Sequence, residues 1–185
     1  LIFFSFFFFL IIPRPPRSTL DRSSAASDVY KRQDQGDSWD IQNSGVLNYI
    51  NDIYFLNDSL GWALTFDQEQ PSLDYKSKIL STIDGGTSWQ IENFRFNNFI
   101  LLSIYFQNEN NGWVGAEPHG IFLTTNGGNE WGEAAIDSGC FNGLEINKIR
   151  FFNDSIGVAV GGKFEISGVV WRTNNSGFNW YSECY

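Results

Sequence analysis

Short runs of apolar residues separated by polar turns follow one another along most of this chain, and their order repeats every 42 to 50 residues. In the first repeat, runs at 51–55 and 62–66 flank a turn of Asn, Asp, Ser and Gly, and runs at 78–82 and 89–94 flank an Asp-Gly-Gly turn. Short runs between such turns are typical of antiparallel strands, and Asp-Gly is a strong hairpin signal. We therefore expect two hairpins, and so four strands, in each repeat.

Two sequence motifs recur in phase with these runs. The pattern T-x-[DN]-x-G-x-x-W is complete in three copies, which end at Trp89, Trp131 and Trp180, and a partial copy, DQGDSW, ends at Trp39. Upstream of the complete copies stand IYFLNDSLGW, IYFQNENNGW and IRFFNDSIGV. A four-stranded antiparallel meander of this length is the unit of a β-propeller blade. The chain thus predicts an all-β fold in which residues 34–185 form about three blades of a ring of roughly six to eight.

These motifs resemble the Asp-box, or bacterial neuraminidase repeat, superfamily of propellers. The pairing of G-W/V with T-x-DGG-x-x-W is most similar to the photosystem II assembly-factor-like repeats of plastid, cyanobacterial and many secreted bacterial proteins. The resemblance implies a non-catalytic extracytoplasmic scaffold that holds a protein or glycan. It identifies the fold more firmly than the function, because the same box is found in sialidases, sortilin-type receptors and some glycoside hydrolases.

The residues of the box itself are expected to be structural. A Thr hydroxyl and an Asp or Asn oxygen two residues later can accept hydrogen bonds from the backbone of a tight turn. Asn126 and Asn175 replace Asp84 in the later copies, and an amide keeps the acceptor but cannot act as a general base. No metal or cofactor is therefore expected at the boxes. Their structural positions are Thr82, Asp84, Gly86, Trp89, Thr124, Asn126, Gly128, Trp131, Thr173, Asn175, Gly177 and Trp180.

Length variation is concentrated on one propeller face, and repeat proteins usually bind their partners on such a face. The gap between the turn glycine and the box threonine is 21, 12 and 16 residues in the three repeats. Acidic groups beside aromatic ones suit a cationic protein patch or a sugar, although a solvated rim explains them equally well. The candidate binding residues on this variable-loop face are Asp67, Glu69, Asp74, Tyr75, Glu117, His119, Phe164 and Glu165. We expect His119 to lie in an exposed turn.

The charge balance excludes a nucleic-acid partner. The net charge is −9, and from Asp34 onward seven basic residues face 19 acidic ones. Nucleic-acid affinity comes largely from basic side chains. Photosystem factors of this family are expected to be basic, so this departure favours the secreted bacterial relatives. On the first strands of the blades, Asp52 and Tyr54 are in register with Lys148 and Arg150 of the third repeat. Lys148 and Arg150 could contact an anion or be paired with neighbouring carboxylates.

No catalytic constellation stands out, and we do not expect an enzyme. A sialidase-like site would need three arginines around a carboxylate, and Arg95, Arg150 and Arg172 do not obviously converge. Two alternatives stay open: a fragment of a sialidase-like or other glycoside-hydrolase propeller, and a spacer in a secreted adhesin or surface protein.

The first 33 residues differ from the rest. The apolar run at 1–12 is shorter than the roughly 20 residues that span a bilayer, so no membrane span is expected. Residues 13–33 are rich in Pro, Ser and Arg, and 1–33 resembles translated sequencing-adapter sequence, with a signal peptide and linker as the alternative. If 1–33 is not native, the chain is a fragment, and its raw edges would favour self-association. Cys140 and Cys184 could pair or stay free thiols.

Overall fold

The computed structural model describes residues 30–31, 40–68, 75–92, 94–137, 144–163 and 167–183. Every regular element within these ranges is a β-strand, and the predicted all-β propeller fold is confirmed. The strands are β1 (Tyr30–Lys31), β2 (Asp40–Ile41), β3 (Tyr49–Phe55), β4 (Gly61–Gln68), β5 (Tyr75–Thr82), β6 (Gln90–Glu92), β7 (Ile100–Phe106), β8 (Gly112–Glu117), β9 (Gly120–Thr124), β10 (Gly132–Glu133), β11 (Ala135–Ile136), β12 (Ile146–Phe151), β13 (Gly157–Lys163), β14 (Ser167–Thr173) and β15 (Asn179–Glu183).

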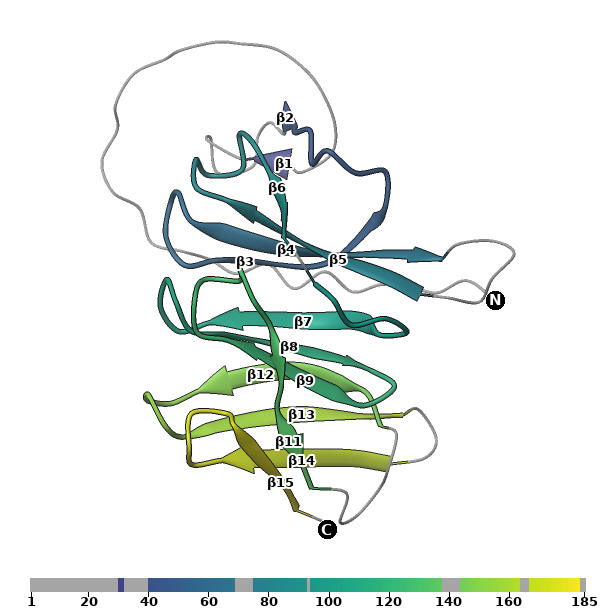
Figure 1. Cartoon of the computed structure of the whole chain (residues 1–185), viewed down its shortest axis with the longest axis vertical. Helices are drawn as coiled ribbons and strands as arrows, with labels where there is room; N and C mark the ends of the chain where they lie inside the picture. Colours follow the sequence, from purple (N-terminus) through teal and green to yellow (C-terminus); the bar gives the residue numbers. More distant parts are fainter. Residues whose placement is uncertain are drawn as a thin grey trace.

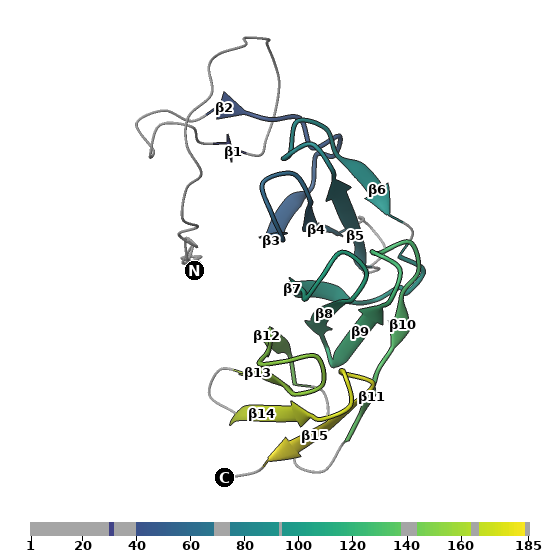
Figure 2. The ribbon, with the colours of Figure 1, turned by 90° about the vertical axis from the view of Figure 1, so that its left-hand side faces the viewer.

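Three antiparallel meanders correspond to the three predicted blades. Their strand orders are β3-β4-β5-β6, β7-β8-β9-β10 and β12-β13-β14-β15. Figure 2 shows the three sheets one after another along a curved stack, with the inner strands β3, β7 and β12 on its concave side. The inner strand β7 contacts both β3 and β12. The outer strands are shorter than expected, because β6 and β10 hold only three and two residues.

A fourth pair of strands precedes the first blade. In β1 and β2, Tyr30 pairs with Ile41 and Lys31 with Asp40. The same offset joins Leu80 to Ile91 in the third and fourth strands of the first blade. The pair β1–β2 thus has the register of the outer half of a further blade, around the partial box. Its first strand belongs to the stretch 1–33 that sequence reasoning set apart.

The chain leaving the second blade adds a strand to the third, which the sequence did not predict. Strand β11 runs parallel to β15, so the third sheet has five strands. The Ala135 amide donates to the Phe178 carbonyl at 2.9 Å, and the Asp137 amide donates to the Trp180 carbonyl at 2.8 Å. An outer strand otherwise presents unpaired backbone groups, and this pairing satisfies them.

Apolar side chains fill the spaces between adjacent blades. Between the first and second blades, Trp62, Leu64 and Ile79 pack with the inner-strand residues Ile104 and Phe106. Between the second and third blades, an equivalent cluster is built around a different set of buried residues, which includes Trp113, Ile121, Ile146, Ile149, Trp171 and Trp180. Each blade therefore buries its faces only by stacking on its neighbours, as a repeat architecture requires.

The inner-strand phenylalanine requires a glycine at the first position of the second strand. A Cβ on Gly61 would lie 2.6 Å from the Phe55 ring, and one on Gly112 would lie 2.5 Å from the Phe106 ring. Gly157 and Phe151 repeat the relationship at 2.9 Å. This steric contact explains why the F-x-x-x-x-x-G spacing recurs in every repeat.

Candidate functional site: box turns, variable-loop face and inner-strand axis

The side chains of the first box are used within its own turn. The Thr82 hydroxyl donates to Asp84 Oδ1 at 2.8 Å and accepts from the Gly86 amide at 2.9 Å. The same Asp84 oxygen accepts from the Ser88 amide at 2.8 Å. Hydrogen bonds from Ser88, first from its side chain and then from its backbone, lower the pKa of Asp84, whereas desolvation acts in the opposite direction. The carboxylate therefore stays ionised as an acceptor and has no tendency to hold a proton for acid catalysis.

In the other two boxes, the side-chain oxygens of Asn126 and Asn175 accept the same hydrogen bonds as Asp84 Oδ1. Thr124 donates to Asn126 Oδ1 at 2.9 Å and Thr173 donates to Asn175 Oδ1 at 3.0 Å. The hydroxyl of each threonine accepts from the amide of the box glycine at 3.0 Å. On the side of the turn that leads into the fourth strand, the Glu130 amide donates to Asn126 Oδ1. The Asn179 amide donates to Asn175 Oδ1 in the same way. Only an acceptor oxygen is needed at this position, so Asp and Asn serve equally.

On the variable-loop face, His119 is half-buried rather than exposed. Its Nδ1 lies 3.2 Å from the Leu144 carbonyl oxygen, and its ring centroid lies 5.9 Å from that of Trp171. The turn between β8 and β9 is where the sequence placed it, but the imidazole packs toward the third blade. Leu144 lies two residues before the start of β12 in the third blade.

Two carboxylates on the same face, Glu117 and Glu145, repel each other electrostatically. Burial raises the pKa of Glu145, and the neighbouring negative charge of Glu117 raises it further, while Lys163 lowers it. Glu117 ends β8 and Lys163 ends β13, so the group joins two blades. A pair of like charges with one lysine nearby can attract a cationic group.

The other residues predicted for the variable-loop face lie outside the described residues, or only their backbone is described. Strand pairing of Gln68 with Tyr75 brings the ends of β4 and β5 together. The side chains of Asp67 and Tyr75 are outside the described residues, as are Glu69, Asp74, Phe164, Glu165, Cys140 and Cys184.

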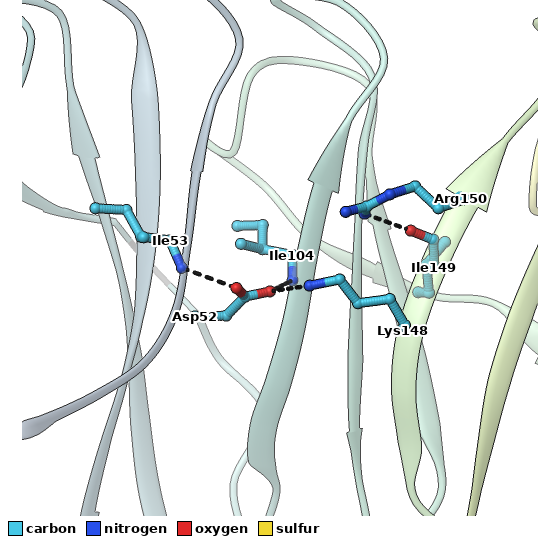
Figure 3. A network of polar contacts seen from close by, with 6 residues as sticks. All are labelled: Asp52, Ile53, Ile104, Lys148, Ile149 and Arg150. Atoms are coloured by element: carbon cyan, nitrogen blue, oxygen red, sulfur yellow. Dashed lines mark hydrogen bonds and ion pairs between the residues drawn. The ribbon is translucent and has the colours of Figure 1, made fainter. Parts of the chain in front are cut away.

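One carboxylate joins the inner strands of all three blades at the axis. Asp52 on β3 accepts from the Ile104 amide on β7 at 3.0 Å and from Lys148 Nζ on β12 at 3.3 Å, both through Oδ2. Its other oxygen accepts from the Ile53 amide at 3.0 Å. Figure 3 shows these contacts converging on the carboxylate. Sequence reasoning put Asp52 and Lys148 in register and left pairing with a carboxylate as one option, and the structure identifies that partner.

Aromatic rings flank this ion pair. The Arg150 guanidinium lies 5.3 Å from the centroid of Tyr105, and its Nη1 donates to the Ile149 carbonyl at 2.8 Å. The Tyr54 and Tyr105 rings meet edge to face with centroids 5.5 Å apart. Burial and then Tyr105 raise the pKa of Tyr54, while Arg150 lowers it. The phenol therefore stays neutral and can donate a hydrogen bond. We call Asp52, Tyr54, Tyr105, Lys148 and Arg150 the axial cluster.

Two classes of site are not seen in the described part of the chain. No group of three or more His, Cys, Asp or Glu residues there is arranged to hold a metal ion. Within the same ranges, no helix has the length and hydropathy needed to cross a bilayer. The three arginines considered for a carboxylate grip lie in different elements: Arg95 follows β6 beside Phe96, Arg150 is in β12 and Arg172 is in β14.

Comparisons with known proteins assign the repeats to a family. The model of the family described as photosynthesis system II assembly factor YCF48 matches residues 31–184. A structure titled "YCF48 bound to D1 peptide" is similar at 23% identity and a TM-score of 0.57, and YCF48 from Cyanidioschyzon merolae at 20% and 0.56. Each similarity covers 73% of this chain and 39% of the solved one. No curated protein sequence matches significantly. The chain belongs to the family of the photosystem II assembly factor YCF48, with bacterial-neuraminidase-type repeats.

Proposed function

We propose that this chain is a non-catalytic scaffold that binds a polypeptide segment at the axial cluster. The observation that carries the proposal is the presentation of two basic groups, Lys148 and Arg150, beside tyrosine rings on the inner strands. The Lys148 side chain is 44% exposed, although it is ion-paired, so an incoming group can reach it. Charges and rings on the inner strands of blades are suited to a peptide, because the rings bury its apolar parts and the charges fix its orientation.

The ligand group that fits best is a carboxylate. Asp52 already shows how a carboxylate is held here, by backbone amides of the inner strands and by Lys148. A side-chain or C-terminal carboxylate of the partner would compete with Asp52 for Lys148 and take a charge-assisted bond from Arg150. Support also comes from the related YCF48 whose structure is described as bound to a D1 peptide.

A non-catalytic role rests on where the described carboxylates are used. Asp84 closes its box turn, and its lowered pKa is the opposite of what a general acid needs. Asp52 holds β7 and β12 through Oδ2, and its Oδ1 accepts from the Ile53 amide of its own strand. The glycoside-hydrolase alternative needs two carboxyl groups, one on either side of a glycosidic bond. The match to the solved relatives covers only 39% of their length, so this alternative concerns blades that the chain does not include. An extracytoplasmic location, a glycan partner and self-association stay predictions.

A second surface for a protein partner is the Glu117 and Glu145 pair on the variable-loop face. The raised pKa of Glu145 reflects burial and then repulsion from Glu117, and a cationic side chain would relieve that repulsion. This surface would attract a basic segment, whereas the axial cluster would attract an acidic one.

The test uses the D1 peptide as the probe, fluorescently labelled, with binding followed by anisotropy. Lys148→Ala and Arg150→Ala should each weaken binding about tenfold, because each removes one charge-assisted contact. Lys163→Ala is the matched control, since it removes a lysine from the variable-loop face. Equal loss in all three variants would mean that only net charge matters, and no loss in the first two would overturn the axial cluster as the contact site.

A further inference from the structure

The carboxylate of Asp52 stands at a position where the other two blades carry different chemistry. Asp52, Ser103 and Lys148 are each the first paired residue after the register shift in their inner strand. Ser103 is buried, and its hydroxyl makes no hydrogen bond within the described part of the chain. The second blade therefore packs on the third without a carboxylate at this position. Stacking of the blades alone does not require the charge of Asp52.

Asp52 is held in place by backbone groups as well as by Lys148. Its Oδ1 accepts from the Ile53 amide at 3.0 Å, and its Oδ2 accepts from the Ile104 amide at 3.0 Å. The Asp52 side chain is 19% exposed, whereas that of Lys148 is 44% exposed. Strand amides are fixed by the sheet, but the lysine ammonium ends a flexible four-carbon stem. Lys148 is therefore the partner that can leave this ion pair.

Lys148 and Arg150 can reach the same ligand group. They stand two residues apart on β12, and Figure 3 shows both side chains extending to the same side of the strand. The two Cα atoms of such a pair are about 7 Å apart, so one carboxylate between the side chains can bond to both. The Arg150 guanidinium uses Nη1 for the Ile149 carbonyl and carries further N–H donors. Lys148 can join this contact only by turning away from Asp52.

We propose that Asp52 is a specificity-determining residue of the axial cluster, which competes with the ligand for Lys148 and excludes ligands of high negative charge. This inference rests on the proposed function, in which the axial cluster binds a carboxylate. In the free chain, Asp52 occupies Lys148. On binding, Lys148 exchanges one carboxylate for another, while Asp52 stays on the amides of Ile53 and Ile104. Because one ion pair replaces another, the net gain is small and the ligand stays exchangeable.

The charge balance of the axial cluster sets the second part of this specificity. Lys148 and Arg150 bring two positive charges, and Asp52 brings one negative charge that stays beside the bound ligand. The sum is one positive charge, which matches one carboxylate. A phosphate dianion would add a second negative charge close to Asp52, and like charges at such a distance repel. The ligand selected is therefore a peptide carboxylate rather than a phosphate group.

The experiment is a double-mutant cycle read by anisotropy of the labelled D1 peptide. Asp52→Asn should tighten binding about fivefold, because an exposed ion pair no longer competes for Lys148. In a chain that already carries Lys148→Ala, the same substitution relieves only repulsion and should tighten binding about twofold or less. Asp58→Asn is the matched control, since it removes the same charge from an exposed turn of the same blade, and it should change nothing.

The cycle separates competition from simple charge. Equal gains from Asp52→Asn with and without Lys148 would overturn the competition, and so would no gain at all. The proposed function fails in a different way, because Lys148→Ala and Arg150→Ala would then leave the affinity of the wild-type chain unchanged. If those two variants lose affinity and the cycle is additive, only the role of Asp52 is wrong.

Two further measurements test the selectivity and the moving part. Inorganic phosphate and acetate are compared as competitors of the peptide, and Asp52→Asn should strengthen phosphate more than acetate. An unchanged ratio of their potencies would overturn the exclusion of highly charged ligands. In the wild-type chain, hydrogen exchange of the Ile104 amide should be equally slow with and without the peptide, because Asp52 stays in place. Faster exchange on binding would mean that Asp52 moves instead of Lys148, and would overturn the proposal without relying on any variant that fails to fold.

Discussion

Lys148 Nζ lies 3.3 Å from Asp52 Oδ2, although the two residues belong to the inner strands of the third and first blades. The contact passes across β7, whose Ile104 amide bonds to the same oxygen. One carboxylate therefore fixes the spacing of three inner strands, and Lys148 is both a structural contact and an accessible charge of the axial cluster. A ligand that binds Lys148 competes with Asp52 for its ammonium group and weakens the ion pair between the blades. Ligand binding and the stability of the stack are therefore expected to be linked.

The Asp52 contacts can be separated by two substitutions. Asp52→Asn keeps an acceptor for the Ile104 amide and loses only the ion pair, which is partly exposed, so it should cost less than about 1 kcal/mol. Asp52→Ala also removes the acceptor and should cost about 1–3 kcal/mol. Urea unfolding measures both, and Lys148→Met should match the smaller loss. An Ala variant no less stable than the Asn variant would contradict the role of the backbone amides.

The first box should respond to acid and the other two should not. The bonds from Ser88 hold the pKa of Asp84 below its ordinary value of 3.8, so the stability this group contributes is present above that value. It is lost as the pH falls through the lower folded pKa. Asp84→Asn copies the second and third boxes and should flatten the decline in thermal stability below pH 4. Identical pH profiles for the two proteins would show that the ionised form is not favoured by folding.

Removing an internal indole should be far more costly than changing Val158, which has the register-equivalent position in the third blade. Trp113→Val leaves a cavity against Phe151 and should cost about 3–5 kcal/mol. Val158→Ala, at the register-equivalent position, should cost less than about 1 kcal/mol because Val158 lines an open surface hollow. Urea unfolding with unchanged m-values is the measurement. Comparable losses would mean that Val158 is already packed in solution.

Glu145 should make the protein less stable as the pH rises. Burial and then Glu117 raise its folded pKa above the ordinary 4.5, so the folded state holds the proton more tightly than the unfolded state. Stability then falls between the unfolded and the folded pKa and stays lower above it. Glu145→Gln should raise the melting temperature at pH 7 and leave it unchanged at pH 4. Lys163→Ala should make the loss of stability with rising pH larger, because Lys163 lowers the pKa of Glu145. If both variants showed the wild-type dependence of melting temperature on pH, the interaction of these three charges would be contradicted.

Much of the fold follows from local patterns in the chain. The box spacing, the Asn-rich turns and the glycine facing each inner-strand Phe are short-range features, and they predicted three four-stranded blades. Turn chemistry and the two-residue period of a strand act over a few residues, so they can be read without knowing what each blade packs against.

What the tertiary structure decided lies between the blades. The sequence could place Asp52 and Lys148 at equivalent positions, yet only the stacking of three inner strands brings residues 96 positions apart into contact. The same stacking turns His119 toward Trp171, adds β11 to the edge of β15 and leaves Val158 beside a surface hollow. The sequence by itself determined the repeating unit, because that unit is stabilised locally. The curvature of the stack and the packing of side chains across it determined the axial cluster, because that cluster depends on contacts between repeats.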